Sequence, residues 1–533
     1  MPDERLLGGV SANRRSALVL SAPERAVFAS GVASMAMEIV AGRMVTPAFG
    51  GSIFTWGSII GVFLAALSVG YALGGRYARA HASRESLVAL LAFSALAVAL
   101  IAAGGDSAIG LFEGIGVPAR YAPILPVTVL FGPPTFLLGL ISPFAAELSA
   151  VESTGEASGR VYAVGTVGSI VGAFGATFVL IPTFEVATSG LLLAALLVLG
   201  AVSMAERTPE SAAAIGVALL VVLSGSVVVY GAPRGDDVLV DTQTAYADLR
   251  VTEEDGVRTM YIGGVPQSAT YVDGREGYVF DYAAYAHLPL LLQNDTERAL
   301  FIGGGGFTIP QRYVEEYPNV TVDVAEIDPE VVRVAKEQFG LEEGPRMNVH
   351  VEDGRNYLER TNHTYDVIVL DAFRTDSVPF HLTTREFMRR VADALDEDGV
   401  LVANVITARS GSNAAFGRAM VKTMNETFPR TYQFPTSNTP ALQNIELLAT
   451  KSEERYTREE FRTLAANRNV GVDLSGTARF MRPAREVRTG EVPLLVDGDA
   501  PVDSLLAEQA GDQYVVSGWN DSGSTAAGST AGG

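Results

Sequence analysis

The stretch 299-ALFIGGGGFTIP-310 joins a short apolar run to four consecutive glycines and then to the expected start of a helix. A short apolar run bounded by glycines is typical of a buried strand. Glycines at the end of such a strand allow a ligand to approach the backbone closely. We therefore expect residues 303–306 to form a ligand-binding loop at the carboxyl end of a strand.

Strands and helices alternate on both sides of this loop. The short connections between them predict a parallel sheet with helices on both faces. A small antiparallel hairpin at 249–264, with Asp255-Gly256 at its turn, precedes them. The expected helices are 276–293, 308–317, 329–338, 355–361 and 383–397, and the expected strands are 298–303, 320–325, 347–351, 366–371 and 399–405. Segments near 411–427, 443–450 and 457–468 complete the domain.

Acidic residues stand at the ends of the next three expected strands. Glu326 and Asp328 end the second, Asp353 is followed by Gly354 at the end of the third, and Asp371 ends the fourth. In a parallel sheet these positions meet at one edge, and an acid about 20 residues after a glycine loop commonly accepts ribose hydroxyls. The chain has no GxxxxGK[ST] motif, which argues against a nucleoside triphosphatase. The pattern predicts a nucleoside site, although Asp371 could instead cap the following turn.

The first 231 residues contain seven apolar runs long enough to cross a bilayer. We predict a multi-pass helical membrane domain, with Gly70 and Gly74 and the series Gly165, Gly168, Gly172 and Gly175 spaced for close helix contacts. The runs are 26–49, 54–75, 86–104, 122–146, 161–183, 188–205 and 212–231. Glu38 and Arg43 lie inside the first run, where an ion pair, a snorkelling Arg or a transport role are all open.

The side of the membrane that the second half faces is ambiguous. Arginines in the N-terminal segment and in the second loop between spans place both in the cytoplasm by the positive-inside rule. An odd number of spans then places the rest outside. Glycosylation sequons at Asn294, Asn319, Asn362, Asn425 and Asn520 suit that side, although chance explains them equally well.

Composition excludes several kinds of chemistry. The chain has no Cys, and its five His lack metal-binding spacing, so we expect no metal. Most of the net charge of −21 falls in the second half, which argues against a nucleic-acid partner. An acidic surface of this kind fits a salt-adapted protein. The oligomeric state is left open, with a homo-oligomer among the possibilities.

Three segments carry a resemblance to a known family: 325-AEIDPEVV-332, 353-DGRNYL-358 and 370-LDAFRTDSVPFHLTTREFMRRVADALDEDGVLVANV-405. With the glycine loop, they resemble the membrane-fused branch of the spermidine synthase (polyamine aminopropyltransferase) family, over about residues 26–470. The resemblance implies an α/β class I methyltransferase-like (Rossmann-like) domain. It also implies decarboxylated S-adenosylmethionine as co-substrate and an amine acceptor, putrescine in the simplest case, so that the bilayer and a small amine are the expected partners.

The resemblance assigns roles to particular residues. Asp371 matches the proton-accepting Asp of the family. The adenosine end is assigned to Gly303, Gly304, Gly305, Glu326, Asp328, Asp353 and Gly354. The possible acceptor-binding residues are Tyr246, Gln267, Tyr282, Arg374 and Asp376.

Four positions depart from the family pattern at the acceptor end. Gly306 and Arg374 stand where the family has Asp, and Ala247 stands where it has Gln. The family's Tyr-His-Glu reads 281-DYA-283. Together these changes predict an altered acceptor pocket, which a loop shift at Asp376 or the retained Gln267 could restore. The alternative is a non-catalytic membrane transporter or sensor that binds a nucleoside or polyamine.

The expected domain organisation follows from these assignments. An N-terminal segment (1–25) precedes the membrane domain (26–231), a small β domain (232–275) and the α/β domain (276–470). A C-terminal extension (471–533) follows, with a Gly/Ser/Thr-rich tail from about residue 498 that we expect to be disordered.

Overall fold

The structure is a computed structural model in which the chain divides into two compact units, Met1–Pro233 and Arg234–Gly533. The described residues are 20–507, 509 and 514–516, with gaps at 113–114, 116, 150–153, 206–207, 232–236, 294 and 375–376. The predicted N-terminal segment therefore lies almost wholly outside the described residues.

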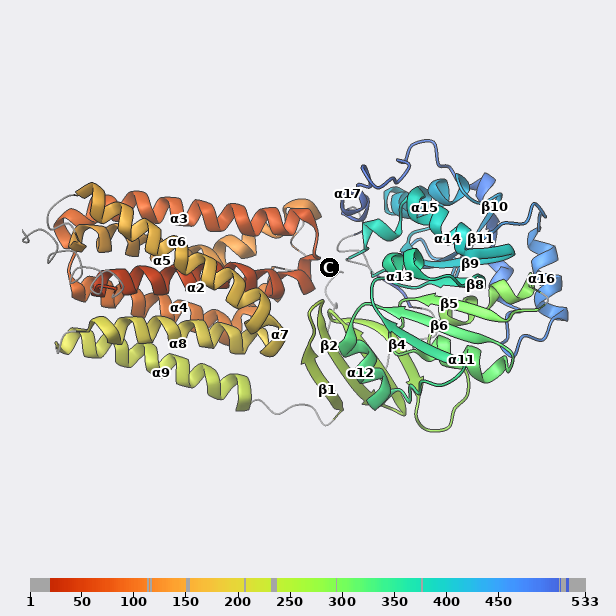
Figure 1. The fold of residues 1–533 in the computed structure, drawn as a ribbon, viewed down its shortest axis with the longest axis horizontal. Helices are drawn as coiled ribbons and strands as arrows, with labels where there is room; N and C mark the ends of the chain where they lie inside the picture. Colours follow the sequence, from red (N-terminus) through yellow and green to blue (C-terminus); the bar gives the residue numbers. More distant parts are fainter. Residues whose placement is uncertain are drawn as a thin grey trace, which may run out of the picture. The chain divides into compact units, whose positions relative to one another are not determined.

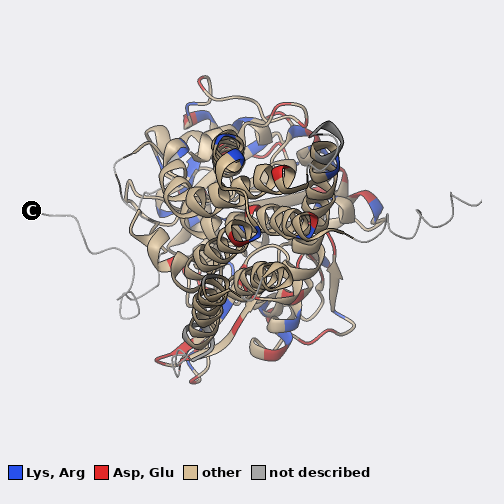
Figure 2. Cartoon of the chain, turned by 90° about the vertical axis from the view of Figure 1, so that its left-hand side faces the viewer, with Lys and Arg blue, Asp and Glu red and all other residues tan. Residues whose placement is uncertain are grey.

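The first unit is a bundle of long apolar helices (Figure 1). Six helical segments are long and apolar enough to cross a membrane. The ribbon of these helices is mostly tan in Figure 2, with few residues coloured as Lys, Arg, Asp or Glu. The seventh predicted span, 212–231, corresponds to α9, but its described apolar part, Ser211–Val227, is shorter than the others. The helices are α2 (Ala22–Phe49), α3 (Ile53–His81), α4 (Arg84–Gly110), α5 (Ile124–Ser149), α6 (Thr154–Gly175), α7 (Ile181–Thr183), α8 (Val186–Met204) and α9 (Pro209–Gly231).

Glycines bring the helices of this bundle into backbone contact. A Cβ atom at Gly172 of α6 would lie 2.3 Å from the carbonyl oxygen of Val32 in α2. A Cβ atom at Gly70 of α3 would lie 2.6 Å from the carbonyl oxygen of Phe136 in α5. The predicted close contacts therefore exist, except at Gly175, whose surroundings are open. Any larger residue at the contacting positions would push the helices apart.

The second unit begins with an antiparallel sheet of four strands rather than one hairpin. Its strands are β1 (Val238–Gln243), β2 (Asp248–Glu254), β3 (Val257–Ile262) and β4 (Val265–Tyr271), paired in chain order. The predicted turn at Asp255-Gly256 joins β2 to β3, and both residues have positive φ, +50° and +73°. A two-residue turn with positive φ at both positions matches the right-handed twist of the two strands that it joins.

The main sheet has eight strands in the order β12-β10-β11-β9-β8-β5-β6-β7. The five from β9 to β7 are parallel, and β11, β10 and β12 are antiparallel to their neighbours. This is the predicted Rossmann-like α/β fold of class I methyltransferases. The strands are β5 (Arg298–Ile302), β6 (Thr321–Glu326), β7 (Met347–Val351), β8 (Tyr365–Leu370), β9 (Leu395–Thr407), β10 (Arg430–Pro435), β11 (Gln443–Thr450) and β12 (Arg482–Pro483).

Helices cover both faces of this sheet. Successive side chains along each strand point to opposite faces, and they form two apolar cores with these helices. Apolar residues of α13 (Gly354–Arg360), α14 (Arg385–Ala394) and α15 (Ala415–Asn425) pack in one core. Those of α11 (Thr308–Glu316), α12 (Pro329–Gln338) and α16 (Arg458–Asn467) pack in the other.

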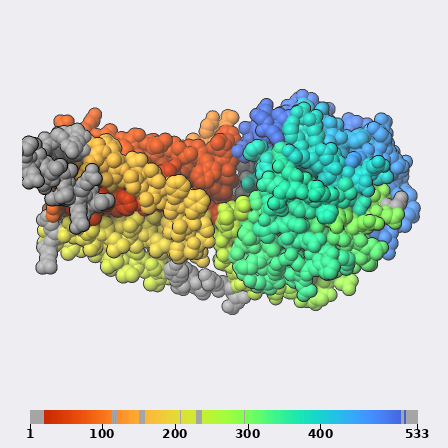
Figure 3. Space-filling view, viewed as in Figure 1, coloured from red at the N-terminus to blue at the C-terminus, as the bar shows by residue number. Residues whose placement is uncertain are grey.

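Two predictions along this unit were wrong in extent. The expected helix 276–293 is reduced to α10 (Tyr282–Tyr285) and a 3₁₀ turn at Leu288–Leu291, because Pro289 has no N–H for a helical hydrogen bond. The disordered tail expected from about residue 498 starts too early. Val502–Leu506 form α17, and Val502 and Leu506 are buried in the apolar core that also contains residues of α14 and α15. Residues near 500 are dark blue at the surface of the second unit in Figure 3.

A buried histidine ties the α11 side of the sheet to the C-terminal segment. His287 is fully buried, with Nε2 2.7 Å from the Tyr278 hydroxyl and Nδ1 2.6 Å from the Tyr317 hydroxyl. Tyr317 donates its proton to the carbonyl oxygen of Val470, so it accepts from the Nδ1–H of His287. Burial lowers the pKa of His287 to about 3, which keeps the ring neutral in the folded protein.

Candidate active site

The glycine loop after β5 lies between the ends of two neighbouring strands. Gly303 has a φ of +96°, and a Cβ atom there would lie 2.2 Å from the carbonyl oxygen of Asp371, which follows β8. The N–H of Gly304 donates to Glu326 at the end of β6 at 2.8 Å. The loop therefore brings together the carboxyl ends of β6, β5 and β8, as the sequence predicts.

Glu326 and Asp328 are both buried at the tip of β6. The second carboxylate oxygen of Glu326 accepts from the N–H of Asp328 at 2.9 Å. Burial raises the pKa of Glu326, and the N–H groups that donate to it oppose this shift. Asp328 caps α12 by accepting from the N–H of Glu330. The backbone thus fixes the Glu326 carboxylate against the glycine loop.

Asp353 begins α13 at the end of β7. One carboxylate oxygen accepts from the N–H groups of Arg355 and Asn356, each at 3.0 Å. The other lies 2.8 Å from Nε2 of His381, a residue to which the sequence analysis gave no role. Gly354 is buried against Ile302 of β5.

The phenol of Tyr246 lies near the three carboxylates at these strand ends. Its side chain is half exposed, in the loop between β1 and β2. Burial raises its pKa first, and the charges of Asp328, Glu326 and Asp353 raise it further. Tyr246 is therefore placed beside the carboxylates that the sequence predicts for a nucleoside.

Asp371 is held by a chain of amide side chains from the next two strands. Its carboxylate accepts from the Asn404 amide on β9 at 2.8 Å, and Asn404 accepts from the Asn444 amide on β11 at 2.9 Å. Asn444 in turn accepts from the Tyr514 hydroxyl at 2.9 Å. Burial raises the pKa of Asp371, and the bond from Asn404 opposes this. The bond comes from a strand, not from the turn that Asp371 was alternatively expected to cap.

Tyr282 and Gln267 lie close to this group. The Tyr282 hydroxyl donates to the backbone carbonyl of Gln267 at 2.9 Å. Burial raises the pKa of Tyr282 strongly, and the largest charge effect on it comes from Asp371. Tyr282 thus lies near Asp371, and Gln267 contacts Tyr282 through its backbone.

Arg374 lies against the small sheet. Its Nη2 atom is 2.5 Å from the place where a Cβ atom of Gly263 would stand, in the turn between β3 and β4. Gly263 has a φ of +61°. The turn therefore needs glycine both for its backbone and to accommodate the guanidinium. Asp376 lies outside the described residues.

Gly306 has close neighbours in place of the expected carboxylate. Its N–H donates to Ser268 Oγ at 2.9 Å, and a Cβ atom at 306 would lie 2.8 Å from the Ser268 Cβ. Phe339 would lie 3.1 Å away. The next residue, Phe307, is fully buried at a φ of +57°.

Glu446 on β11 was missed by the sequence analysis. It is 3% exposed, and it pairs in register with Asn404 of β9. Burial raises its pKa well above the usual range, and the charge of Asp371 adds to the shift. In the sequence, Asn404 could have been found as a polar residue within 399-GVLVANVIT-407. Asn444 and Glu446 could have been found as polar residues among the apolar ones of 443-QNIELLAT-450.

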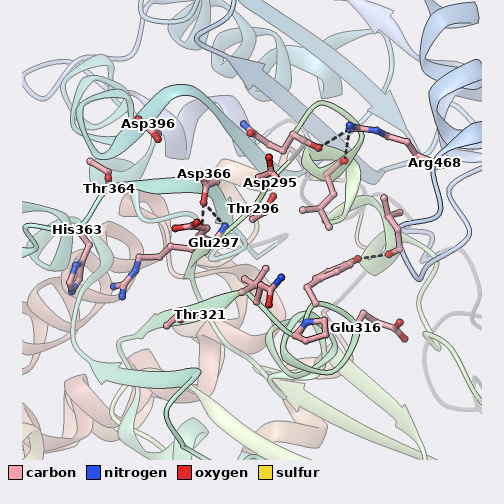
Figure 4. Close-up of a pocket in the computed structure, with 18 of the residues that line it drawn as sticks. Asp295, Thr296, Glu297, Glu316, Thr321, His363, Thr364, Asp366, Asp396 and Arg468 are labelled. Carbon is pink, nitrogen blue, oxygen red and sulfur yellow. Dashed lines mark hydrogen bonds between the residues drawn. The ribbon is translucent and has the colours of Figure 1, made fainter.

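A cavity of about 1210 Å³ lies at the opposite edge of the sheet (Figure 4). It is lined by residues at the amino ends of β5, β6 and β8, including Glu297, Thr321 and Asp366. Asp366 accepts from the N–H groups of Glu297 and Arg298, and Arg468 donates to three backbone carbonyls. Its charged groups are thus engaged in holding loops. Among the described residues, no group of three or more His, Asp or Glu could hold a metal ion.

Residues 282–458 match the family model described as the spermine/spermidine synthase domain. This part of the chain is therefore similar to that family. The matched range contains the strand ends that carry Glu326, Asp353 and Asp371, together with Asn404, Asn444 and Glu446.

Curated relatives of this spermine/spermidine synthase domain include the polyamine aminopropyltransferase of Vibrio vulnificus (strain CMCP6). It is 33% identical over 178 residues, 32% of this chain and 60% of that protein. Polyamine aminopropyltransferase 1 of Aquifex aeolicus (strain VF5) is 35% identical over 176 residues, 31% of this chain and 59% of that protein. The chain thus spans about three fifths of the length of these relatives. A solved structure described as a probable spermidine synthase from Corynebacterium glutamicum ATCC 13032 superposes with a TM-score of 0.41 at 21% identity, covering 49% of this chain and 96% of that one.

Proposed function

We propose that the chain is a membrane-bound aminopropyltransferase that moves an aminopropyl group from decarboxylated S-adenosylmethionine to an amine. The observation that carries this proposal is Asp371. Its carboxylate has a raised pKa and is held by Asn404 next to the glycine loop, within a spermine/spermidine synthase domain.

The reaction needs a proton acceptor at the attacking nitrogen. The neutral amine forms a bond to the carbon beside the sulfonium, the carbon–sulfur bond breaks, and methylthioadenosine leaves with the electron pair. The nitrogen then gives up one proton, which Asp371 accepts. A carboxylate with a raised pKa takes that proton more readily than an exposed one, and the Asn404 amide keeps it oriented.

The remaining strand ends bind the nucleoside in this proposal. Glu326, fixed by two N–H donors, accepts from the ribose hydroxyls, with Asp328 beside it. Asp353 lies at the adenine end, where His381 holds its other oxygen. Gly303, Gly304 and Gly305 allow the sulfonium side of the nucleoside to approach the backbone. Tyr246 covers the site from the small sheet.

The substitution Asp371→Asn tests the proposal. The variant keeps the shape and the contact with Asn404 but cannot take a proton, so turnover should fall about 10²–10⁴-fold. Methylthioadenosine should bind as in the wild type. Asp396→Asn, an exposed position by the cavity at the far edge of the sheet, is the matched control and should leave turnover unchanged. Full turnover in Asp371→Asn, measured by mass spectrometry of methylthioadenosine, would refute the assignment. The alternative, a binding-only transporter or sensor, is not favoured and would show no turnover in any variant.

The domain faces the cytoplasm in this proposal, because sulfonium nucleosides are cytoplasmic metabolites. The side depends on whether α9 crosses the membrane. A reporter fused after α8 and one fused at the C-terminus should both read cytoplasmic if the six longer helices are the spans and α9 is not. If the reporter after α8 reads cytoplasmic and the C-terminal reporter reads outside, this arrangement is wrong.

A further inference from the structure

Glu446 carries a buried carboxylate, and one of its oxygen atoms accepts no hydrogen bond from the described part of the chain. Its exposed fraction is 3%, and its Oε1 atom is fully buried with no hydrogen-bond partner in the described part of the chain. A buried carboxylate without a partner is costly, so proteins rarely retain one in a buried strand. Both flanking residues, Ile445 and Leu447, lie in the apolar core on the other face.

The strand register places Glu446 in the group around Asp371. Asn404 of β9 stands directly opposite Glu446, so the two side chains share a face, with Cβ atoms about 5 Å apart. Asn404 donates to Asp371 from this position. Asn444, two residues before Glu446 on the same face, completes the amide chain to Tyr514. The two carboxylates thus flank one amide side chain at the carboxyl end of the parallel strands.

Among the described residues, the charges that act on the pKa of Glu446 do not include a positive one. Burial raises this pKa most, and the charge of Asp371 raises it further. The other groups facing it are phenols: the charge of Glu446 contributes to raising the pKa values of Tyr282, Tyr285 and Tyr514. Two neighbouring carboxylates in a site lined by phenols are an arrangement that a bound cation would stabilise.

We propose that Glu446 is a specificity-determining residue, which receives the second, non-reacting ammonium of a short diamine acceptor. This inference rests on the proposed function for the role of Asp371 at the reacting nitrogen. When the diamine binds, protonated Glu446 gives its proton to solvent and the carboxylate pairs with the ammonium. The chain then carries on β11 the negative charge that positions 306 and 374 lack.

The test is calorimetric titration of the full-length protein in detergent, saturated with methylthioadenosine. The wild type should bind 1,4-diaminobutane roughly 10- to 100-fold more tightly than 1-aminobutane, the range expected for a hydrogen bond to a charged group. Glu446→Gln should bring this ratio to about 1 while 1-aminobutane and methylthioadenosine bind as before. Glu426→Gln, an exposed position at the end of α15, should keep the wild-type ratio.

Two further measurements keep the inference falsifiable if Glu446→Gln is poorly folded. Calorimetric titrations in two buffers, phosphate and Tris, measure the protons released on binding. The wild type should release a proton when the diamine binds and should retain it when the monoamine binds. Glu446→Asp, which is one methylene shorter, should shift the preference toward 1,5-diaminopentane. A diamine preference that survives Glu446→Gln, or its absence in the wild type, overturns the inference. Diamine binding that depends on Glu446 without any turnover would instead overturn the proposed function alone.

Discussion

The substitution Gly306→Asp, which restores the acid of the family pattern, should destabilise this protein. A Cβ atom at 306 would lie 2.8 Å from the Ser268 Cβ, closer than packed side chains approach, and 3.1 Å from Phe339, which is a tight contact. Inserting a side chain into a packed site costs about 1–3 kcal/mol. At about 2–4 °C per kcal/mol for a domain of 150–250 residues, the apparent Tm should fall by several degrees.

The second variant in this test, Ser268→Gly, removes the nearest obstructing atom. The double variant Gly306→Asp with Ser268→Gly should recover stability, with a coupling of about 1 kcal/mol or more in the cycle. Gly344→Asp is the control, because a Cβ atom at 344 meets nothing within 4 Å. The assay is thermal unfolding of the full chain in detergent, with methylthioadenosine binding as a check of the site. A Gly306→Asp protein as stable as the Gly344→Asp protein would refute the packing explanation.

Three other substitutions test separate parts of the second unit. Glu326→Gln should weaken methylthioadenosine binding about 10- to 100-fold, because a charged acceptor is lost, whereas Glu337→Gln on the outer surface should not. The folded-state pKa of His287, about 3, lies below its unfolded value of about 6.5, so stability is lost as pH falls below 6.5, by about 1.4 kcal/mol per unit. Thermal unfolding of His287→Gln should show a flatter pH dependence, and that of His363→Gln an unchanged one. Gly263→Ala should displace Arg374 and alter amine affinity, unlike Gly264→Ala, where the backbone is equally strained but the space is open.

Local pattern was sufficient to predict the parallel part of the sheet. From β5 to β9, each expected strand and each following helix exists within a few residues of its predicted range, because short βα units are encoded by runs of apolar residues and by strong caps such as Asp328 and Asp353. The helix expected over 276–293 is interrupted at Pro289, and the apolar residues on both sides of it are buried against the sheet. Strand β12 pairs with β10, a segment that is distant in sequence, which no local pattern reveals.

The meeting of the proposed nucleoside-binding carboxylates at one edge was predictable for the same reason. Glu326, Asp353 and Asp371 each follow their own strand directly, so the topology of a parallel sheet alone brings them to one edge. The acceptor end depends on pairing across the sheet. Asn404 and Glu446 become neighbours only through the register of β9 against β11. A search for polar residues inside buried strands would have found Asn404 and Glu446. It would not have shown that they lie near Asp371.

The structure shows what surrounds two of the four positions that depart from the family pattern. At 306, Ser268 and Phe339 occupy the space that a side chain would need, and at 374 the guanidinium lies on the turn at Gly263. Neither position therefore offers a carboxylate, while a strand offers one at Glu446. A carboxylate on a central strand is held more firmly than one on a loop, since its backbone is fixed by hydrogen bonds on both sides. Such a site selects the spacing between two ammonium groups more narrowly than a loop-borne site would. The response of the Glu446→Asp protein to diamine length is therefore the most discriminating measurement of how this acceptor site differs from the family pattern.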